Sequence, residues 1–378
     1  MIERFVVLVM AGCALTLMVP SMSRAADLFV YFGSQATGTD VGFRLAHFDT
    51  ETGALTEPKL ILQADSPSFF VIHPDGKRMY STNFSGAGGV SAYRIDPKTG
   101  ALTLINRVPG NNQSTTFVGL DQSGRYALFA NFDQGHVGVL PIRPDGGLGE
   151  RTAYDFHEGS SINPARQART YPHSMWADPT NRFALVPDLG LDKLFVYRFD
   201  DKTGKLAAND PAFVAVKPGS GPRHMRFSLD GKRVYLLTEM GSLLVAYDWD
   251  GAKGTLKEFQ TVSLLPDGFT GESTAAEIEI HPNGKFLYAS NRGHDSIAVF
   301  GIDPASGRVS LIEHVPTQGK NPRNFAFDPS AKWMLVTNQV GNNAVVFRVD
   351  EQSGRLAQVG KPVEIPAPCC ERFLAVEH

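Results

Sequence analysis

Hydrophobic and polar residues alternate in short runs along most of the chain, as they do in half-buried strands, and the turns between the runs repeat. One turn places Asp and then Gly between two apolar residues, as in the stretch from Ile95 to Leu102. Copies of it begin at Phe48, Ile95, Ile142, Phe199, Trp249, Ile302 and Val349. Their spacing of about 47 to 57 residues is typical of four-stranded propeller blades.

A second turn, Asp-Gly or Asn-Gly, precedes most copies of the first. Examples lie within His73–Tyr80, Ser228–Tyr235 and His281–Tyr288. Asp-Gly and Asn-Gly favour tight hairpins because both residues tolerate positive φ. Each blade therefore reads as four antiparallel strands, A to D, and helical periodicity is absent.

The two ends of the chain are predicted to share one blade. Leu28–Ser34 already reads as a B strand, so the first blade lacks an A strand. Pro368–Phe373 resembles the A-strand segment Pro222–Phe227 and supplies the missing strand. The predicted fold is all-β: a seven-bladed β-propeller with four antiparallel strands per blade, closed by a C-terminal strand that joins the N-terminal blade.

The net charge bears on the kind of partner, and the N-terminal segment bears on the compartment. The 378 residues carry a formal net charge of −3, which gives no basic surface for nucleic acid. Arg4, the apolar run 5–20 and the segment Ser23-Arg24-Ala25 are typical of a cleaved signal peptide. We expect a signal peptide at residues 1–25, a propeller domain at 26–378, a periplasmic location and no membrane insertion after cleavage. Lipid attachment at Cys13 is the weaker alternative.

Two cysteines remain after that cleavage. Cys369 and Cys370 are adjacent, so a disulfide between them would be strained, and the sequence leaves this bridge undecided. Neither has partners at metal-ligand spacing. The sequence contains no phosphate-binding loop before a helix, no nucleophile elbow and no zinc-type spacing, so we expect no metal and no cofactor. It does not indicate the oligomeric state.

The propeller geometry selects candidate site residues. Strand A lies innermost and B runs antiparallel to it, so A-strand starts and B-strand ends open on the same face around the axis. The B-strand ends carry Asn83, Asn131, Asp188, Glu239, Asn291 and Asn338. The A-strand starts carry Ser68, Thr116, His173, Arg223, His224, Glu277 and Arg323.

The charged members of this set form the candidate site. His173, Arg223, Glu239 and Arg292 come from neighbouring blades. They can be explained by mutual salt bridges or by a site for an anionic or oxyanionic ligand. For Asn83, Asn131 and Asn338 a structural role in turns is the simpler explanation. Residues 157–172 form a long insertion that leads into His173 and is typical of a segment covering a site. We predict substrate contacts from His224, Glu277, Asn291, His294, Arg323, Asn338 and Asp188.

Four segments of the chain resemble a known family. Gly221–His224, Leu236–Glu239, Asp188–Asp192 and Ser290–Ser296 are similar to the seven-bladed propeller lactonases, which include one bacterial type of 6-phosphogluconolactonase and a fungal carboxymuconate cyclase. The resemblance covers essentially the whole chain after the predicted signal peptide. It implies metal-independent lactone chemistry. The family's proposed active-site residues fall here on His173, Arg223, Arg292 and Glu239.

The resemblance implies base-activated water attack on a small-molecule lactone. His173 or Glu239 would take the proton, and Arg223 with Arg292 would hold the oxyanion. The expected location favours a periplasmic gluconolactonase, although Arg323 could hold a phosphate. The alternatives are a 6-phosphogluconolactonase, a carboxymuconate-type cyclase, a metal-dependent gluconolactonase and a non-catalytic binding propeller.

Overall fold

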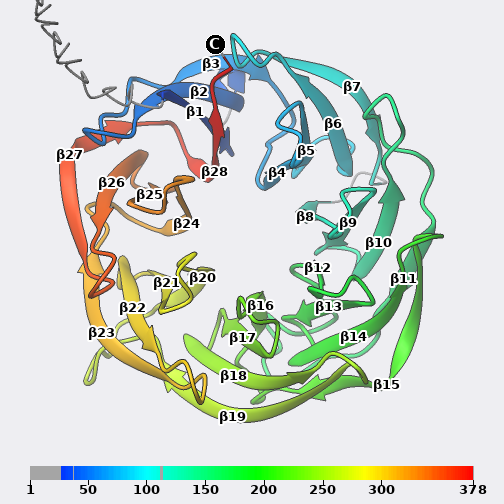
Figure 1. Ribbon diagram of the computed structural model, residues 1–378. Coiled ribbons are helices and arrows are strands. Elements are labelled where there is room, and N and C mark those ends of the chain that lie inside the picture. The colour runs from blue at the N-terminus through cyan, green and yellow to red at the C-terminus, as the bar shows by residue number, and fades with distance from the viewer. Residues whose placement is uncertain (1–26, 37, 111–113, 378) are drawn as a thin grey trace, which may run out of the picture.

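The strands of the computed structural model form a ring of small sheets around an axis (Figure 1). The structure describes residues 27–36, 38–110 and 114–377. These residues form seven four-stranded antiparallel sheets, as the sequence predicts, and their one helical segment is the short 3₁₀ helix η1 (Gly38–Asp40). The signal peptide and Cys13 predictions lie outside the described residues.

Each blade contributes one strand to each of four concentric layers. The innermost strands are β28 (Pro368–Ala375), β4 (Phe70–Ile72), β8 (Thr115–Leu120), β12 (Trp176–Ala177), β16 (Pro222–Phe227), β20 (Thr274–Ile280) and β24 (Pro322–Phe327). The second strands are β1 (Asp27–Ser34), β5 (Arg78–Thr82), β9 (Tyr126–Asn131), β13 (Phe183–Asp188), β17 (Arg233–Thr238), β21 (Phe286–Arg292) and β25 (Trp333–Asn338).

The two outer layers complete the blades. The third strands are β2 (Gly42–Asp49), β6 (Val90–Ile95), β10 (His136–Pro141), β14 (Lys193–Asp200), β18 (Leu243–Asp250), β22 (Ser296–Ile302) and β26 (Asn343–Val349). The outermost strands are β3 (Lys59–Gln63), β7 (Leu102–Val108), β11 (Ala153–Phe156), β15 (Lys205–Ala215), β19 (Thr255–Ser263), β23 (Val309–Pro316) and β27 (Leu356–Glu364).

The C-terminal strand closes the ring, which confirms the prediction. In Figure 1, β28 lies beside β1 at the start of the chain. Their antiparallel register pairs Leu28 with Ala375 and Phe32 with Glu371. The closing strand covers an edge of β1 that would otherwise expose its backbone hydrogen-bonding groups.

The repeated Asp-Gly turns have a physical cause that the structure shows directly. In the turn after β6, the carboxylate of Asp96 accepts hydrogen bonds from the amides of Lys98 and Thr99, both at 2.9 Å. Gly100 then takes a φ of 71°, which residues with a Cβ rarely adopt, and its amide bonds Asp96 O at 2.8 Å. The Asp and Gly of the motif are therefore selected by turn geometry.

Hydroxyl groups of second-layer tyrosines join neighbouring blades. Tyr31 donates to Gly100 O at 2.9 Å and Tyr288 donates to Gly354 O at 2.8 Å, in each case at the turn of the next blade. Tyr80, Tyr126 and Tyr235 make equivalent bonds, and the indole of Trp333 donates to Thr50 O at 2.8 Å across the closure. These bonds fix the blades relative to one another and so position the axial side chains.

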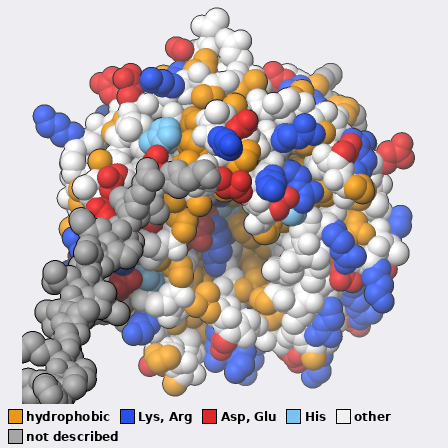
Figure 2. Space-filling model, turned by 45° about the horizontal axis from the view of Figure 1, so that its top comes forward, with side chains coloured by type: hydrophobic (Ala, Val, Ile, Leu, Met, Phe, Trp, Pro, Cys, Tyr) orange, Lys and Arg blue, Asp and Glu red, His pale blue; other side chains and the backbone are white. Residues whose placement is uncertain are grey.

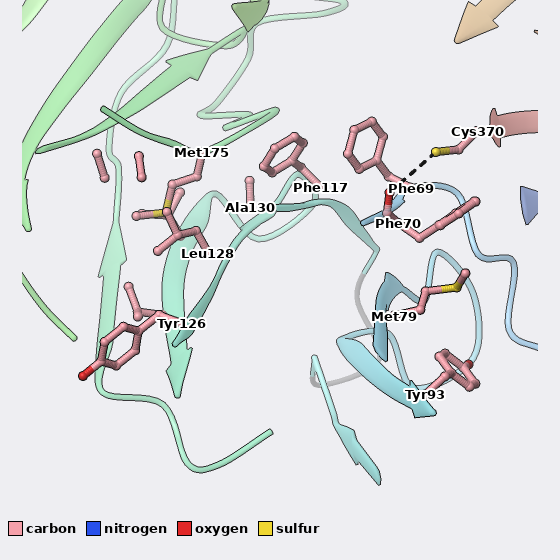
Figure 3. Packing of buried hydrophobic residues seen from close by; sticks show 14 of the residues in the cluster. Phe69, Phe70, Met79, Tyr93, Phe117, Tyr126, Leu128, Ala130, Met175 and Cys370 are labelled. Carbon is pink, nitrogen blue, oxygen red and sulfur yellow. Dashed lines mark hydrogen bonds between the residues drawn. The ribbon is translucent and has the colours of Figure 1, made fainter. Parts of the chain in front are cut away.

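Apolar side chains fill the spaces between blades. Figure 3 shows part of one such cluster, in which the rings of Phe69 and Phe117 lie side by side with centroids 4.9 Å apart. Cys370 lies at the edge of this cluster, with its Sγ 3.9 Å from Phe70 O. Figure 2 shows the ring hollowed at its centre, with basic side chains deep in the hollow and hydrophobic side chains along its walls.

Candidate functional site

The four charged residues predicted from the sequence meet on the face where the inner strands start, which we call the start face. Arg223 is the second residue of β16, and Glu239 directly follows β17. Arg292 ends β21, and His173 precedes β12, where its amide bonds Pro187 O at 3.0 Å. Strand starts and strand ends thus converge as the propeller geometry requires.

Glu239 is the centre of this group. Its Oε2 accepts a hydrogen bond from Arg223 Nε at 3.1 Å and lies 3.1 Å from Arg292 Nη2. Its Oε1 accepts a bond from Arg166 Nη2 at 2.6 Å. His173 Nε2 lies 4.0 Å from Oε2. We call these five residues the arginine cluster.

Backbone carbonyls of β20 hold two of the guanidinium groups. Arg223 Nη1 donates to Ala276 O, and Arg292 Nη2 donates to Ala275 O at 2.9 Å. The amide of Ala275 in turn donates to Glu239 O at 3.0 Å. Because these partners belong to a sheet, the orientation of both guanidinium groups is set before any ligand binds.

β-Bulges re-aim several of the inner-strand side chains. The pairing of β16 with β17 shifts between Pro222 and His224, which makes Arg223 the extra residue of a bulge. The same shift occurs at Thr116 and at Arg323. A bulge turns its extra side chain out of the regular alternation, so a simple period of two would have misplaced these residues.

Burial and the nearby arginines give Glu239 and His173 different charge states. Burial alone would raise the pKa of Glu239, but the guanidinium groups of Arg292 and Arg223 outweigh it and hold this pKa well below its ordinary value. Burial, with the charge of Arg223, holds the pKa of His173 well below its ordinary value. At neutral pH Glu239 is therefore a carboxylate and His173 a neutral imidazole.

Arg223, Arg292 and Arg323 lie close enough on the start face for their positive charges to repel one another. Burial, with repulsion from Arg292 and Arg323, lowers the pKa of Arg223 to about 9. Among the described residues, no carboxylate oxygen lies within 4.0 Å of the guanidinium of Arg323, whose pKa burial and Arg292 also lower. Three guanidinium groups, those of Arg166, Arg223 and Arg292, thus share one carboxylate, and the fourth, that of Arg323, has none. Mutual salt bridging does not explain this excess of positive charge.

Arg166 is the member of the cluster that the sequence did not select, although its insertion was predicted to cover the site. The insertion is fixed by buried contacts: Gln167 Nε2 donates to Leu189 O and to Asp192 Oδ2, both at 2.8 Å. Asp192 also accepts bonds from Ser161 Oγ at 2.6 Å and from the amide of Gly221 at 2.7 Å. One carboxylate therefore ties the insertion to the loop that leads into Arg223.

His224 and Glu277 lie one level deeper along the axis than the cluster. His224 Nδ1 lies 3.0 Å from Glu277 Oε1, and the amide of Asn324 bonds Glu277 Oε2. Both are fully or almost fully buried, with exposures of 2% and 0%. The two levels are in contact, since the rings of His173 and His224 have centroids 5.2 Å apart, and residues of both levels line a cavity of about 10 Å³. Burial, with the charge of Arg223, holds the pKa of His224 well below its ordinary value.

The structure does not bring the other predicted substrate contacts to the cluster. The buried carboxylate of Asp188 bonds His157 at 2.6 Å, Thr170 at 2.5 Å and the amide of Tyr171 at 2.8 Å. Asn291 and Asn338 donate to the backbone of Leu264 and Thr317, and His294 bonds Ser296 and packs against Phe269 and His314. These contacts fit the structural role that strand-end residues have in turns.

The two cysteines of β28 are unbridged and buried. Cys369 Sγ lies 3.3 Å from Gly33 O and Cys370 Sγ lies 3.9 Å from Phe70 O. Burial raises the pKa of both thiols, that of Cys370 to about 12. The thiols are therefore protonated, and they contact the backbone of β1 and β4.

Two features are absent from the described residues. No three His, Cys, Asp or Glu side chains gather there in a group that could hold a metal ion. None of the helices in residues 27–36, 38–110 and 114–377 has the length and apolar character needed to cross a membrane.

Known proteins resemble this chain over nearly its full length. The 6-phosphogluconolactonase of Bacillus subtilis (strain 168) is 35% identical over 345 residues, covering 91% of this chain and 97% of the relative. The solved structure of the periplasmic gluconolactonase PpgL of Pseudomonas aeruginosa is 34% identical with a TM-score of 0.88, covering 93% of this chain and 100% of that one.

A second solved structure, a putative 6-phosphogluconolactonase of Bacteroides fragilis NCTC 9343, is 31% identical with a TM-score of 0.84 and covers 94% of this chain and 99% of that one. The family model described as "Lactonase, 7-bladed beta-propeller" matches residues 29–373. This match and the start-face geometry lead to one conclusion: the chain belongs to the seven-bladed β-propeller lactonase family.

Proposed function

We propose that this lactonase hydrolyses a sugar lactone, with glucono-1,5-lactone as the first candidate, to the aldonic acid. The observation that carries the proposal is the arginine cluster, in which a buried neutral imidazole lies 4.0 Å from a carboxylate held by three guanidinium groups. Hydrolysis of a lactone needs a base for water and a positive site for the tetrahedral oxyanion. The cluster supplies both within one small face.

His173 is the better candidate for the base. The low pKa of Glu239 makes its carboxylate a weak proton acceptor, whereas His173 is neutral and has its Nε2 directed toward Glu239. In the proposed step, Nε2 takes a proton from water as the oxygen of that water bonds to the lactone carbonyl carbon. Glu239 stabilises the imidazolium so formed, and the imidazolium returns the proton to the ring oxygen when the C–O bond breaks.

The arginines would stabilise charge at two stages. Arg223 and Arg292, fixed by β20, are placed to hold the developing oxyanion and then the carboxylate of the product. Arg166 reaches the cluster from the covering insertion, with 44% of its side chain exposed, so it stands between Glu239 and solvent. We assign it to the positioning of the incoming lactone.

The expected periplasmic location favours the unphosphorylated substrate. The N-terminal segment reads as a signal peptide, and a similar solved protein is a periplasmic gluconolactonase. Sugar phosphates are cytosolic metabolites, so an exported enzyme would meet free glucono-lactone instead. We therefore propose a periplasmic location for residues 26–378.

One observation favours a second candidate, a 6-phosphogluconolactonase. Arg323 has no carboxylate partner among the described residues and lies on the start face with three other arginines. A phosphate would neutralise that excess charge. The relative in Bacillus subtilis is named for the phosphorylated substrate.

A substrate panel tests the proposal. Acid release would be followed at constant pH with glucono-1,5-lactone, its 6-phosphate and a carboxylated muconolactone, each corrected for spontaneous hydrolysis. We expect the enzyme to prefer the unphosphorylated sugar lactone and to retain its activity after chelator treatment and dialysis. Loss of activity in chelator would support the metal-dependent alternative, and no excess rate with any lactone would support a binding propeller.

A further inference from the structure

A second cavity lies at the opposite end of the axis, on the face where the inner strands end, which we call the end face. It has a volume of about 410 Å³. Its lining includes Phe69, Phe117, Trp176, Arg226, Glu279 and Arg372. None of these residues belongs to the arginine cluster, and no step of the proposed reaction uses them.

The charged residues of this cavity occupy the same strand position in three of the seven blades described. Arg226 pairs with Tyr235, Glu279 with Tyr288 and Arg372 with Tyr31, so each lies opposite a second-layer tyrosine that joins two blades. Side chains two residues apart in a strand share a face. Arg226 and Glu279 therefore share a face of their strands with His224 and Glu277, two residues nearer the end face.

The two arginines of the cavity differ in their partners. Arg226 is neutralised, since its Nε donates to Glu279 Oε2 at 2.8 Å and its Nη2 contacts Oε1 of the same residue. Arg372 Nη1 donates to Asn324 Oδ1 at 2.9 Å and to Glu371 O at 2.6 Å, both neutral acceptors.

Arg372 carries a charge without an ion-pair partner. Within the described ranges no carboxylate oxygen lies within 4.0 Å of its guanidinium. Although burial lowers its pKa, nearby acidic groups such as Glu277 raise that pKa above the ordinary value, so the group stays charged. Its guanidinium lies 5.0 Å from the centre of the Phe69 ring.

The walls around Arg372 are aromatic and apolar. Phe117 lies beside Phe69, and its ring centroid is 4.6 Å from that of Trp176. The cavity volume falls in the range of small-molecule sites, which combine apolar walls with a few placed polar groups. From this geometry we infer a second binding site on the end face for a small organic carboxylate with a flat apolar body, its carboxylate on Arg372 and its body against Phe69, Phe117 and Trp176.

This site is separate from the lactone site. The layer of His224, Glu277 and Asn324, joined by hydrogen bonds, lies between them, and the space above that layer is only about 10 Å³. A ligand on Arg372 therefore lies on the other side of His224 from the arginine cluster, since the His224 ring contacts Phe69 on one side and His173 on the other. The inference does not depend on the proposed function, and it holds whether or not the protein hydrolyses a lactone.

Benzoate is a suitable probe, with benzamide as a neutral molecule of the same shape. Both would be titrated into the purified protein by calorimetry, and the indole signals of ¹⁵N-tryptophan-labelled protein would locate the site. The chain has three tryptophans, so loss of one signal in Trp176→Phe assigns that residue. We expect saturable benzoate binding that shifts the Trp176 signal, and at least tenfold weaker binding of benzamide.

Variants identify the group that binds the carboxylate. Arg372→Met should weaken benzoate binding at least tenfold, whereas Arg355→Met, which removes an arginine paired with Glu313 on an outer strand, should bind as wild type does. Equal affinity for benzoate and benzamide in the wild-type protein, which needs no variant to fold, would overturn the inference. So would saturable binding that leaves the Trp176 signal unmoved.

Discussion

At the scale of single residues, the proposed reaction depends on the protonation state of His173. Burial and the charge of Arg223 hold its pKa well below the ordinary value of 6.5. A base with a lowered pKa stays active as the pH falls, until the pH reaches that lower pKa. We predict that the acid limb of the kcat/KM profile lies below pH 6.5, after spontaneous hydrolysis is subtracted. An acid limb at or above 6.5 would show that another group is the base.

Removing either half of the imidazole–carboxylate pair should abolish most of the excess rate. We expect His173→Ala and Glu239→Gln each to lower kcat on the order of 100-fold or more, since a positioned base contributes roughly that factor. Initial rates with saturating glucono-1,5-lactone measure the effect. Circular dichroism checks that each variant is folded, because both side chains are buried. If the excess rate survives both changes, the assignment of the cluster is wrong.

Arg166 provides a test with a control on the same insertion. Arg166 bonds Glu239 at 2.6 Å, whereas Arg169 is exposed and lies over the ring of Tyr171. We predict that Arg166→Ala raises KM about tenfold with a smaller change in kcat, that Arg166→Lys restores part of the loss, and that Arg169→Ala behaves as wild type. Equal effects of the two alanine variants would mean that only the stability of the insertion matters.

At the scale of strands and turns, the tyrosine bonds between blades make a measurable contribution. We predict that Tyr288→Phe lowers the free energy of unfolding by about 1 kcal/mol, the usual value of one buried hydrogen bond, because Gly354 O loses its donor. Tyr247→Phe is the control, since its buried hydroxyl has no partner among the described residues. That change should be neutral or stabilising. Urea unfolding of the two variants measures these changes. A larger loss of unfolding free energy for Tyr247→Phe than for Tyr288→Phe would contradict the stabilising role of the tyrosine bonds.

Much of the blade pattern can be predicted because turns and alternation are local. A turn that needs an Asp to accept from two amides and a Gly at positive φ can be recognised from these two residues in the sequence, as at Asp96 and Gly100. The convergence of His173, Arg223, Glu239 and Arg292 follows from strand direction alone. Strand direction does not predict how deep along the axis each side chain lies, because that depth depends on bulges such as the one at Arg223.

The rest of the site depends on contacts between distant segments. Arg166 bonds Glu239 from an insertion that Gln167 joins to Asp192, and no local pattern encodes either contact. Asp188 ends its strand as predicted and Asn291 lies one residue before the end of its strand, but the side chains of both bond groups in the turns. A polar residue at a strand end therefore marks the correct face without showing which way its side chain points.

At the scale of the whole molecule, the closing strand makes stability depend on pH. Glu371 of β28 is fully buried, and Thr337 Oγ1 donates to it at 2.7 Å. Burial raises the pKa of Glu371 from its ordinary value of 4.5 to about 8, against the hydrogen bond from Thr337. Between these two values the folded chain binds a proton that the unfolded chain has lost, so the free energy of unfolding falls as the pH rises.

Glu371→Gln should remove this dependence. We predict that the variant is more stable than wild type at pH 8, by on the order of 2 kcal/mol, and that the difference shrinks toward pH 5. Urea unfolding at both pH values measures it. If variant and wild type differed in their free energy of unfolding by the same amount at pH 5 and at pH 8, the carboxyl group would be ionised in the folded ring at both pH values.

The central claim, that the arginine cluster on the start face binds and hydrolyses the lactone, is tested most directly by a crystal structure of the protein with gluconate. We predict that the carboxylate of gluconate lies within about 3 Å of the guanidinium groups of Arg223 and Arg292, with its carboxyl carbon beside His173 Nε2. Gluconate bound away from these three residues, in crystals whose start face is open to solvent, would contradict the account.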